Sequence, residues 1–275
     1  MFVDKMMASY LAPGSIAAFG YAEKIIQVPI MIFTASLATA VFPFFAAQVA
    51  ESRIDELKDS LAKSIQMSGL IFLPITAGLV ALAAPIVQLI LQRGAFDRTA
   101  AEVTSLIVVC FSFQLFFYST VIILVRAFLA FQEIATLVKV VMGGMVLNIV
   151  LNLAFIKLVK PPVAGIALST SCVYLIMACV FFVILRMRIG ALHGKEMLIS
   201  VAKIAVLSAV MGGVMYSMRG VCQRLFPHPM VMGQALALCA AGASGCLIFL
   251  ACGYFINVRE LRSLARFVTP WMRSS

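Results

Sequence analysis

Long apolar runs separated by short charged segments dominate this chain. Most of these runs reach the length of about 20 residues that a helix needs to cross a hydrocarbon core about 30 Å thick. They do not alternate apolar and polar residues in segments of about ten, as membrane-spanning strands do. The pattern predicts an all-α, polytopic helical membrane protein with about seven full transmembrane helices. The predicted spans are built on residues 25–50, 65–91, 103–125, 140–156, 163–185, 198–218 and 225–258.

Residues 1–11 form a shorter apolar segment that contains Asp4 and Lys5. The turn sequence Ala-Pro-Gly-Ser follows at residues 12–15. No basic stretch precedes the apolar residues, so the segment does not resemble a signal peptide. We interpret it as the end of a partial first helix, in a chain that begins within a larger transporter.

Residues 51–63 carry Ile54, Leu57 and Leu61 at helical spacing, with charged residues between them. This pattern predicts a short amphipathic helix that lies in the cytoplasmic interface of the membrane. Prolines within the flanking spans (Pro29, Pro43, Pro74 and Pro85) predict bent helices of the kind that transporters use.

Composition supports the membrane assignment, since 63% of residues are hydrophobic and 12% are charged. The net charge of +10 reflects the side of the membrane on which the basic residues lie, not a nucleic-acid partner. Connecting segments assigned to one side hold about twice as many Lys and Arg residues as those on the other. The positive-inside rule then places residues 51–63 and the basic C-terminal tail in the cytoplasm.

Several kinds of chemistry are not encoded. The seven cysteines are scattered without a Cys-x-x-Cys pair, and His193 and His228 stand far apart. The chain contains neither a phosphate-binding Walker loop nor a nucleophile elbow. We therefore expect neither an enzyme nor an ATP-driven pump.

Lys24 stands at the edge of the apolar run 25–50, beside Glu23 and one turn before Gln27. A charge at this depth is costly unless it faces a partner or a water-filled cavity. In one interpretation Lys24 meets a phosphate of an anionic substrate as a point charge, with Glu23 and Gln27 beside it. In the other, Glu23 and Lys24 neutralise each other while the lysine extends to the headgroups.

Asn148 and Asn152 share one face of a predicted helix because they are four residues apart. Hydroxyls follow in the next span at residues 169–171, and Asp4 is a carboxylate in an apolar stretch. Oxygen ligands of these kinds suit a hard cation such as sodium. The alternative is hydrogen bonding between helices or back to helix carbonyls. The spacing of these residues does not show that the helix with Asp4 contacts the two helices that carry the asparagines and the hydroxyls.

Several segments, in order, resemble the MurJ/MviN family of lipid II flippases. Residues 21–29 (YAEKIIQVP) are similar to the family's Y-A-D-R-L-x-Q-L-P segment. The family's later stretches resemble Leu73-Pro74, Pro85-Ile86, residues 91–96, residues 148–153 and residues 165–171. This resemblance covers residues 1–190, and the last two spans match mainly in number and placement.

The resemblance implies a fourteen-helix transporter of the MATE-like exporter superfamily, with two six-helix lobes around a central cavity. Residues 1–190 would form the second lobe with its first helix truncated, and residues 191–258 would be two extra helices that help form a groove for a lipid tail. Residues 259–275 would be a basic cytoplasmic tail. The first lobe would be supplied in cis or, as a separate chain, in trans.

The family carries an essential basic residue, usually arginine, where Lys24 stands. Lysine keeps the charge but loses the bidentate fork of arginine. The family's sodium site falls on Asp4, Asn148, Asn152 and a residue near Thr170. The resemblance thus implies transport of undecaprenyl-pyrophosphate-linked muropeptide across the bacterial inner membrane for cell-wall synthesis, with sodium as the one candidate cofactor.

Other functions remain open. One is a related lipid-linked oligosaccharide flippase or drug exporter. A second is a prenyl-phosphate glycosyltransferase, which would need clustered carboxylates at the membrane face, whereas the acidic residues of segment 51–63 lie among lysines. A third is a fragment that transports nothing by itself.

Overall fold

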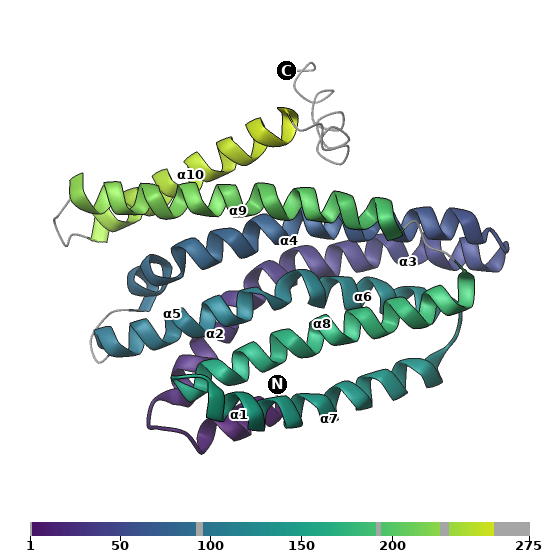
Figure 1. Cartoon of the computed structure of the whole chain (residues 1–275), viewed down its shortest axis with the longest axis horizontal. Helices are drawn as coiled ribbons and strands as arrows, with labels where there is room; N and C mark the ends of the chain where they lie inside the picture. The colour runs from purple at the N-terminus through teal and green to yellow at the C-terminus, as the bar shows by residue number, and fades with distance from the viewer. Residues whose placement is uncertain (1, 92–95, 191–193, 226–230, 256–275) are drawn as a thin grey trace.

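The computed structural model describes residues 2–91, 96–190, 194–225 and 231–255, and within these ranges it contains helices and no strand. The long helices run along a common axis, with α9 and α10 at one edge beside α4, and α7 and α8 at the other (Figure 1). The predicted tail at 259–275, His193 and His228 lie outside the described residues. The elements are α1 (Phe2–Ser9), α2 (Ser15–Pro29), η1 (Ile30–Thr34), α3 (Ala35–Ala50), α4 (Ile54–Leu91), α5 (Arg98–Ser112), α6 (Gln114–Ala130), α7 (Ile134–Leu158), α8 (Pro162–Ile189), α9 (Gly194–Leu225) and α10 (Val231–Phe255).

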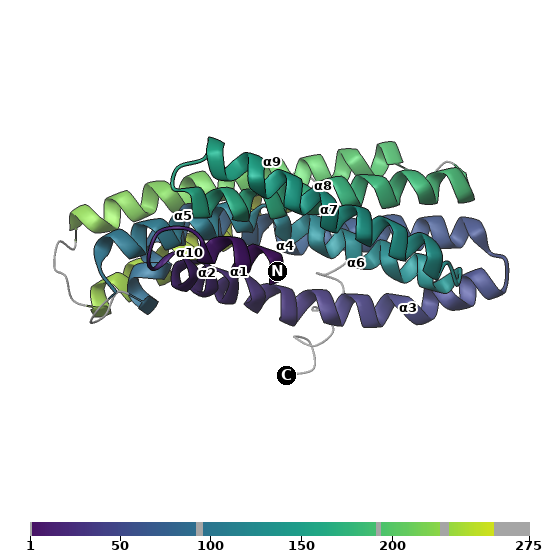
Figure 2. The ribbon, with the colours of Figure 1, turned by 90° about the horizontal axis from the view of Figure 1, so that it is seen from below.

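The predicted membrane fold is confirmed. Among the described residues, six helical segments are long and apolar enough to cross a membrane: Ser15–Ala50, Ile54–Leu91, Arg98–Ala130, Ile134–Leu158, Pro162–Ile189 and Gly194–Gly220. The seventh predicted span falls on α10, in which Leu238–Ala251 is apolar. The short apolar segment at the start of the sequence forms α1, which lies beside α2 (Figure 2) and also contacts α8.

The prediction of a separate amphipathic helix at residues 51–63 is wrong. Residues from Ile54 onward are the first turns of α4, which continues without interruption for 38 residues. At 1.5 Å per residue such a helix is about 57 Å long, so it extends well beyond the hydrocarbon core. Leu57 and Leu61 are buried in a protein core with Phe45 of α3 and Leu124 of α6. The apolar face is therefore covered by neighbouring helices instead of lipid.

Two spans contain irregular turns. Pro29 is followed by the five-residue π-helical turn η1, which widens the helix where proline removes a backbone donor. The span Arg98–Ala130 is interrupted at Phe113, between α5 and α6. There the carbonyl of Ser112 accepts a hydrogen bond from the Thr76 hydroxyl of α4, 3.0 Å away. A side chain from a neighbouring helix thus satisfies backbone that the interruption exposes.

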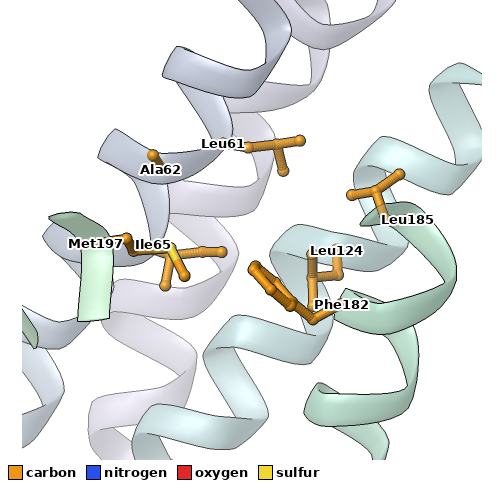
Figure 3. A pocket seen from close by; sticks show the side chains of 7 residues that line it. All are labelled: Leu61, Ala62, Ile65, Leu124, Phe182, Leu185 and Met197. Carbon is orange, nitrogen blue, oxygen red and sulfur yellow. The ribbon is translucent and has the colours of Figure 1, made fainter. Parts of the chain in front are cut away.

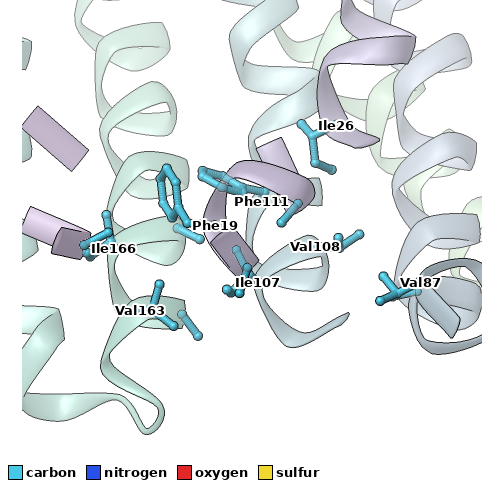
Figure 4. Close-up of a cluster of buried hydrophobic side chains, with 14 of the residues drawn as sticks. Phe19, Ile26, Val87, Ile107, Val108, Phe111, Val163 and Ile166 are labelled. Carbon is cyan, nitrogen blue, oxygen red and sulfur yellow. The ribbon is translucent and has the colours of Figure 1, made fainter. Parts of the chain in front are cut away.

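An apolar core fixes α2 against α5 and α8 (Figure 4). Phe19 and Phe111 meet edge to face with ring centroids 5.1 Å apart, and both are almost fully buried. Ile26 of α2 and Ile166 of α8 belong to the same core. This packing sets the rotation of α2, and with it the direction in which Glu23 and Lys24 point.

At the other end of the bundle, α4, α6 and α8 meet Met197 of α9 around a small void of about 10 Å³ (Figure 3). Its lining includes Ile65, Leu124 and Phe182 and is entirely apolar. A void of this size and character stays dry, so it is a packing defect and not a ligand site.

We predict that Gly165→Ala destabilises the hairpin of α7 and α8. A Cβ at Gly165 would lie 2.5 Å from the backbone oxygen of Phe155, and backbone cannot move aside as a side chain can. The expected loss is about 1–3 kcal/mol of unfolding free energy, measured as thermal unfolding in detergent.

Gly143→Ala is the matched control, because a Cβ there would have nothing within 4 Å. Equal unfolding temperatures for the two variants would contradict the close approach of α7 and α8.

Candidate functional site

A buried polar cluster joins α1, α7 and α8 inside the membrane region. The amide nitrogen of Asn152 donates to a carboxylate oxygen of Asp4 at 2.9 Å and contacts the amide oxygen of Asn148 at 3.2 Å. Ser169 donates to the amide oxygen of Asn152. The amide of Asn148 reaches the Thr170 hydroxyl at 3.5 Å. All four residues proposed for sodium, namely Asp4, Asn148, Asn152 and Thr170, are therefore brought together.

The donor set of this cluster fits a small hard cation. Asp4 is 1% exposed and Asn152 fully buried, and the cluster combines this one carboxylate with the amide and hydroxyl oxygens of Asn148, Asn152, Ser169 and Thr170. The Thr170 hydroxyl donates to the Ile166 carbonyl at 3.0 Å, which leaves its oxygen lone pairs directed elsewhere. Sodium is held by oxygens of these kinds. Over the described ranges, no three or more His, Cys, Asp and Glu side chains gather, so the amides and hydroxyls are essential to any such site.

Lys24 and Gln27 are exposed on the same side of α2, whereas Glu23 is buried. The Lys24 ammonium lies 5.8 Å from the ring centroid of Tyr21, a cation–π arrangement. Of the three predicted substrate-binding residues, the structure thus places two on an exposed surface and turns the third inward.

Glu23 pairs with Lys5 of α1 and not with its neighbour Lys24. The Lys5 ammonium is 2.7 Å from a Glu23 carboxylate oxygen, and the Glu23 side chain is 8% exposed. The mutual neutralisation of Glu23 and Lys24 considered from the sequence is therefore not the arrangement of this molecule. Consecutive residues of a helix point about 100° apart, and the core around Phe19 turns Glu23 toward α1.

A groove of about 670 Å³ lies between α4, α6 and α9. Small residues of α9, among them Ala209, Gly212 and Gly213, form one wall, and Val80 and Phe117 belong to the opposite wall. Thr76, Ser208 and Tyr216 add the only hydroxyls of its lining. Gly212 allows α9 to approach α4 closely, since a Cβ there would lie 3.2 Å from the backbone oxygen of Ala77. Such a surface suits an apolar chain better than a charged group.

Two residues of the site were missed from the sequence. One is Lys5, whose place next to Asp4 in an apolar segment is the signal that marks it. The other is Ser169, which lies in a run of three hydroxyl residues that the sequence does not distinguish, and the structure puts it in contact with Asn152. The groove residues of α4 and α6 carry no sequence signal, because they are ordinary apolar residues.

We predict that Asn152→Leu lowers the unfolding free energy by about 1–3 kcal/mol, since it removes the hydrogen bond that the Asn152 amide donates to the buried carboxylate of Asp4. Thermal unfolding in detergent would measure the loss. Thr39→Val is the control: its exposed hydroxyl bonds only to the Ala35 carbonyl of its own helix, so a change within about 0.5 kcal/mol is expected. A stability of Asn152→Leu equal to that of the control would rule out the dependence of Asp4 on this amide.

Comparison with known proteins identifies the family. The family model for the lipid II flippase MurJ matches residues 1–236. A "probable lipid II flippase MurJ" of Synechocystis sp. is 30% identical over 223 residues, which is 78% of this chain and 41% of that protein. Its counterpart in Thermotoga maritima is 29% identical over 218 residues, 79% of this chain and 43% of that protein.

Solved structures share the fold. A lipid II flippase MurJ in an inward closed conformation superposes with a TM-score of 0.71 at 23% identity, covering 94% of this chain and 50% of that one. A MOP superfamily transporter from Pyrococcus furiosus gives a TM-score of 0.60 at 15% identity, covering 95% of this chain and 62% of that one. The chain spans about two fifths of the length of the curated relatives described above. On the family match, this multi-pass membrane protein belongs to the lipid II flippase MurJ family.

Proposed function

We propose that this chain is the C-terminal half of a lipid II flippase, which moves undecaprenyl-pyrophosphate-linked muropeptide from the inner to the outer leaflet of the bacterial inner membrane. Membership of the MurJ family supports this substrate class and a role as a transporter rather than an enzyme. The substrate joins a long apolar tail to a pyrophosphate, so a carrier needs a cationic contact and an apolar surface.

The observation that carries the proposal is the state of Lys24. Its ammonium is exposed on α2, and across the described residues it forms no salt bridge, because Glu23 is engaged by Lys5. An ammonium without a carboxylate partner, at membrane depth, favours an anionic ligand. A lysine meets phosphate as a point charge with three donors.

The groove between α4, α6 and α9 supplies the apolar surface for the lipid tail. Its volume of about 670 Å³ is in the range of small-molecule sites, about 300–1,000 Å³. The sequence resemblance implies that the two extra helices help form a groove for the lipid tail. The geometry favours a groove that α9 shares with α4 and α6 of the lobe.

We assign Asp4, Asn148, Asn152 and Thr170 as the residues that hold sodium. When bound, the ion would supply positive charge to a carboxylate that is otherwise buried in an apolar bundle. The four side chains belong to three helices, so occupancy of the cluster acts on how firmly α1 is attached to α7 and α8.

Transport requires an N-terminal lobe, in cis or in trans, because alternating access rocks one lobe against the other. We assign residues 1–190 to the C-terminal lobe and 191–258 to the added helix pair. The charge distribution of the connecting segments supports a cytoplasmic C-terminus, with the basic tail against anionic headgroups.

Lys24→Met is expected to weaken binding of lipid II by about tenfold to hundredfold, since a hydrogen bond to a charged group is lost. Lys24→Arg retains the charge and is expected to bind as tightly as the wild type. Affinity is measured with purified lipid II and the protein in nanodiscs of zwitterionic lipid.

Lys157→Met, which removes an exposed lysine at the end of α7, is the control and should change nothing. Equal affinities for Lys24→Met and wild type would remove Lys24 from the substrate site. Binding of cationic drugs in place of lipid II would instead favour a drug exporter of the same fold.

Sodium chloride is expected to stabilise the protein relative to choline chloride, by about 1.4 kcal/mol when sodium is about tenfold above its Kd. Asp4→Asn should abolish this stabilisation, whereas Asp59→Asn, at an exposed carboxylate of α4, should preserve it. Thermal unfolding at constant ionic strength makes the measurement. Stabilisation of Asp4→Asn by sodium would exclude the cluster as the cation site.

A further inference from the structure

Two adjacent residues of α1 serve two different sites. Asp4 is held by Asn152 of α7 at 2.9 Å, and Lys5 holds Glu23 of α2 at 2.7 Å. Neighbouring positions of a helix point in different directions, so one turn of α1 can contact both the cation cluster and α2. The next residue of α2 after Glu23 is Lys24, whose ammonium is exposed.

The charges of Lys5, Glu23 and Lys24 act together on any anion that approaches Lys24. The Glu23 side chain is 8% exposed, so solvent screens its carboxylate poorly. Left alone, that carboxylate would offset the charge of Lys24 and repel a phosphate group. The Lys5 ammonium cancels it, so the three residues together keep one net positive charge on the exposed side of α2.

We propose that Lys5 is a specificity-determining residue for the anionic ligand of Lys24: by neutralising Glu23, it preserves the positive potential that recognises a phosphate-bearing lipid. This inference rests on the proposed function, since it requires that Lys24 contacts phosphate. Lys5 acts through Glu23 and is a positioning residue, half exposed itself and without a direct role in transport.

The arrangement also explains why Glu23 is buried beside a candidate anion site. A carboxylate next to Lys24 would be unfavourable for phosphate binding if it faced the ligand. Turned inward and paired with Lys5, it instead anchors α1 to α2 at the point where Asp4 anchors α1 to α7. The two anchors lie on one turn of a helix, so displacement of α1 affects both.

The test measures binding of geranylgeranyl pyrophosphate to the 275-residue protein in phosphatidylcholine nanodiscs. Lys5→Met should weaken binding about tenfold, the effect of one unit charge at about 10 Å through an effective dielectric constant of about 20. Lys5→Met combined with Glu23→Gln removes both charges of the pair and should restore wild-type affinity. Lys5→Arg should bind as the wild type does.

Lys139→Met removes the same charge from an exposed position near the start of α7 and controls for net charge. Thermal unfolding of each variant verifies folding. Should Lys5→Met fail to fold, Glu23→Gln alone decides the question: it adds one net positive charge beside Lys24 and should bind about tenfold more tightly.

Wild-type affinity in folded Lys5→Met would overturn the proposal, as would a double variant no tighter than Lys5→Met. An unchanged affinity in Glu23→Gln would overturn it likewise. The reference is Lys24→Met: if it binds as the wild type does, the proposed function fails and this inference with it. Weak binding by Lys24→Met with intact binding by Lys5→Met would overturn the role of Lys5 alone.

Discussion

The burial of one carboxylate, Asp4, is the constraint on which the arrangement of the site depends. A carboxylate at 1% exposure inside an apolar bundle must be compensated by hydrogen-bond donors or a cation. Asn152 supplies a donor to Asp4 and also contacts Asn148; Ser169 donates to Asn152, and Asn148 contacts Thr170. Satisfying Asp4 therefore ties the short α1 to α7 and α8. Once α1 is fixed there, its next residue, Lys5, is in reach of α2.

The spans could be predicted from the sequence because a bilayer leaves few alternatives. Each backbone polar group must be paired within its own helix, so long apolar runs are helices and their number follows from hydropathy. The prediction failed for the segment from Ile54 to Leu61. Its apolar face was identified correctly, but the surface that covers this face was not. An amphipathic pattern cannot distinguish lipid from protein as the surface that covers it, and here α3 and α6 cover it. The interruption at Phe113 left no signal because no proline or glycine marks it.

The site was predictable only in part. A spacing of four residues placed Asn148 and Asn152 on one helix face, but the meeting of that face with Asp4 is a tertiary fact that came from resemblance to a family. The adjacency of Glu23 and Lys24 in the sequence suggested that the two could pair, but Glu23 pairs with Lys5. Neighbours in a helix point apart, and the packing of Phe19 decides which of the two is buried. The true partner of Glu23 is eighteen positions earlier, in another helix.

The irregular turns of the bundle converge on one segment of α4. Phe33 of η1 packs edge to face on Phe72, and the break before Phe113 is bound by Thr76, one turn further along α4. Pro74 lies between these two contacts and cannot donate to the carbonyl of Leu70. Three spans thus have weakened backbone hydrogen bonding at neighbouring points, and bending there costs less than elsewhere in their length. Lys24 in α2 and the helix α5 lie on one side of these weakened points. The helices α3 and α6, which continue the same two spans, lie on the other side. A bend at this level would tilt α2 and α5, and with them the exposed Lys24, relative to α3 and α6.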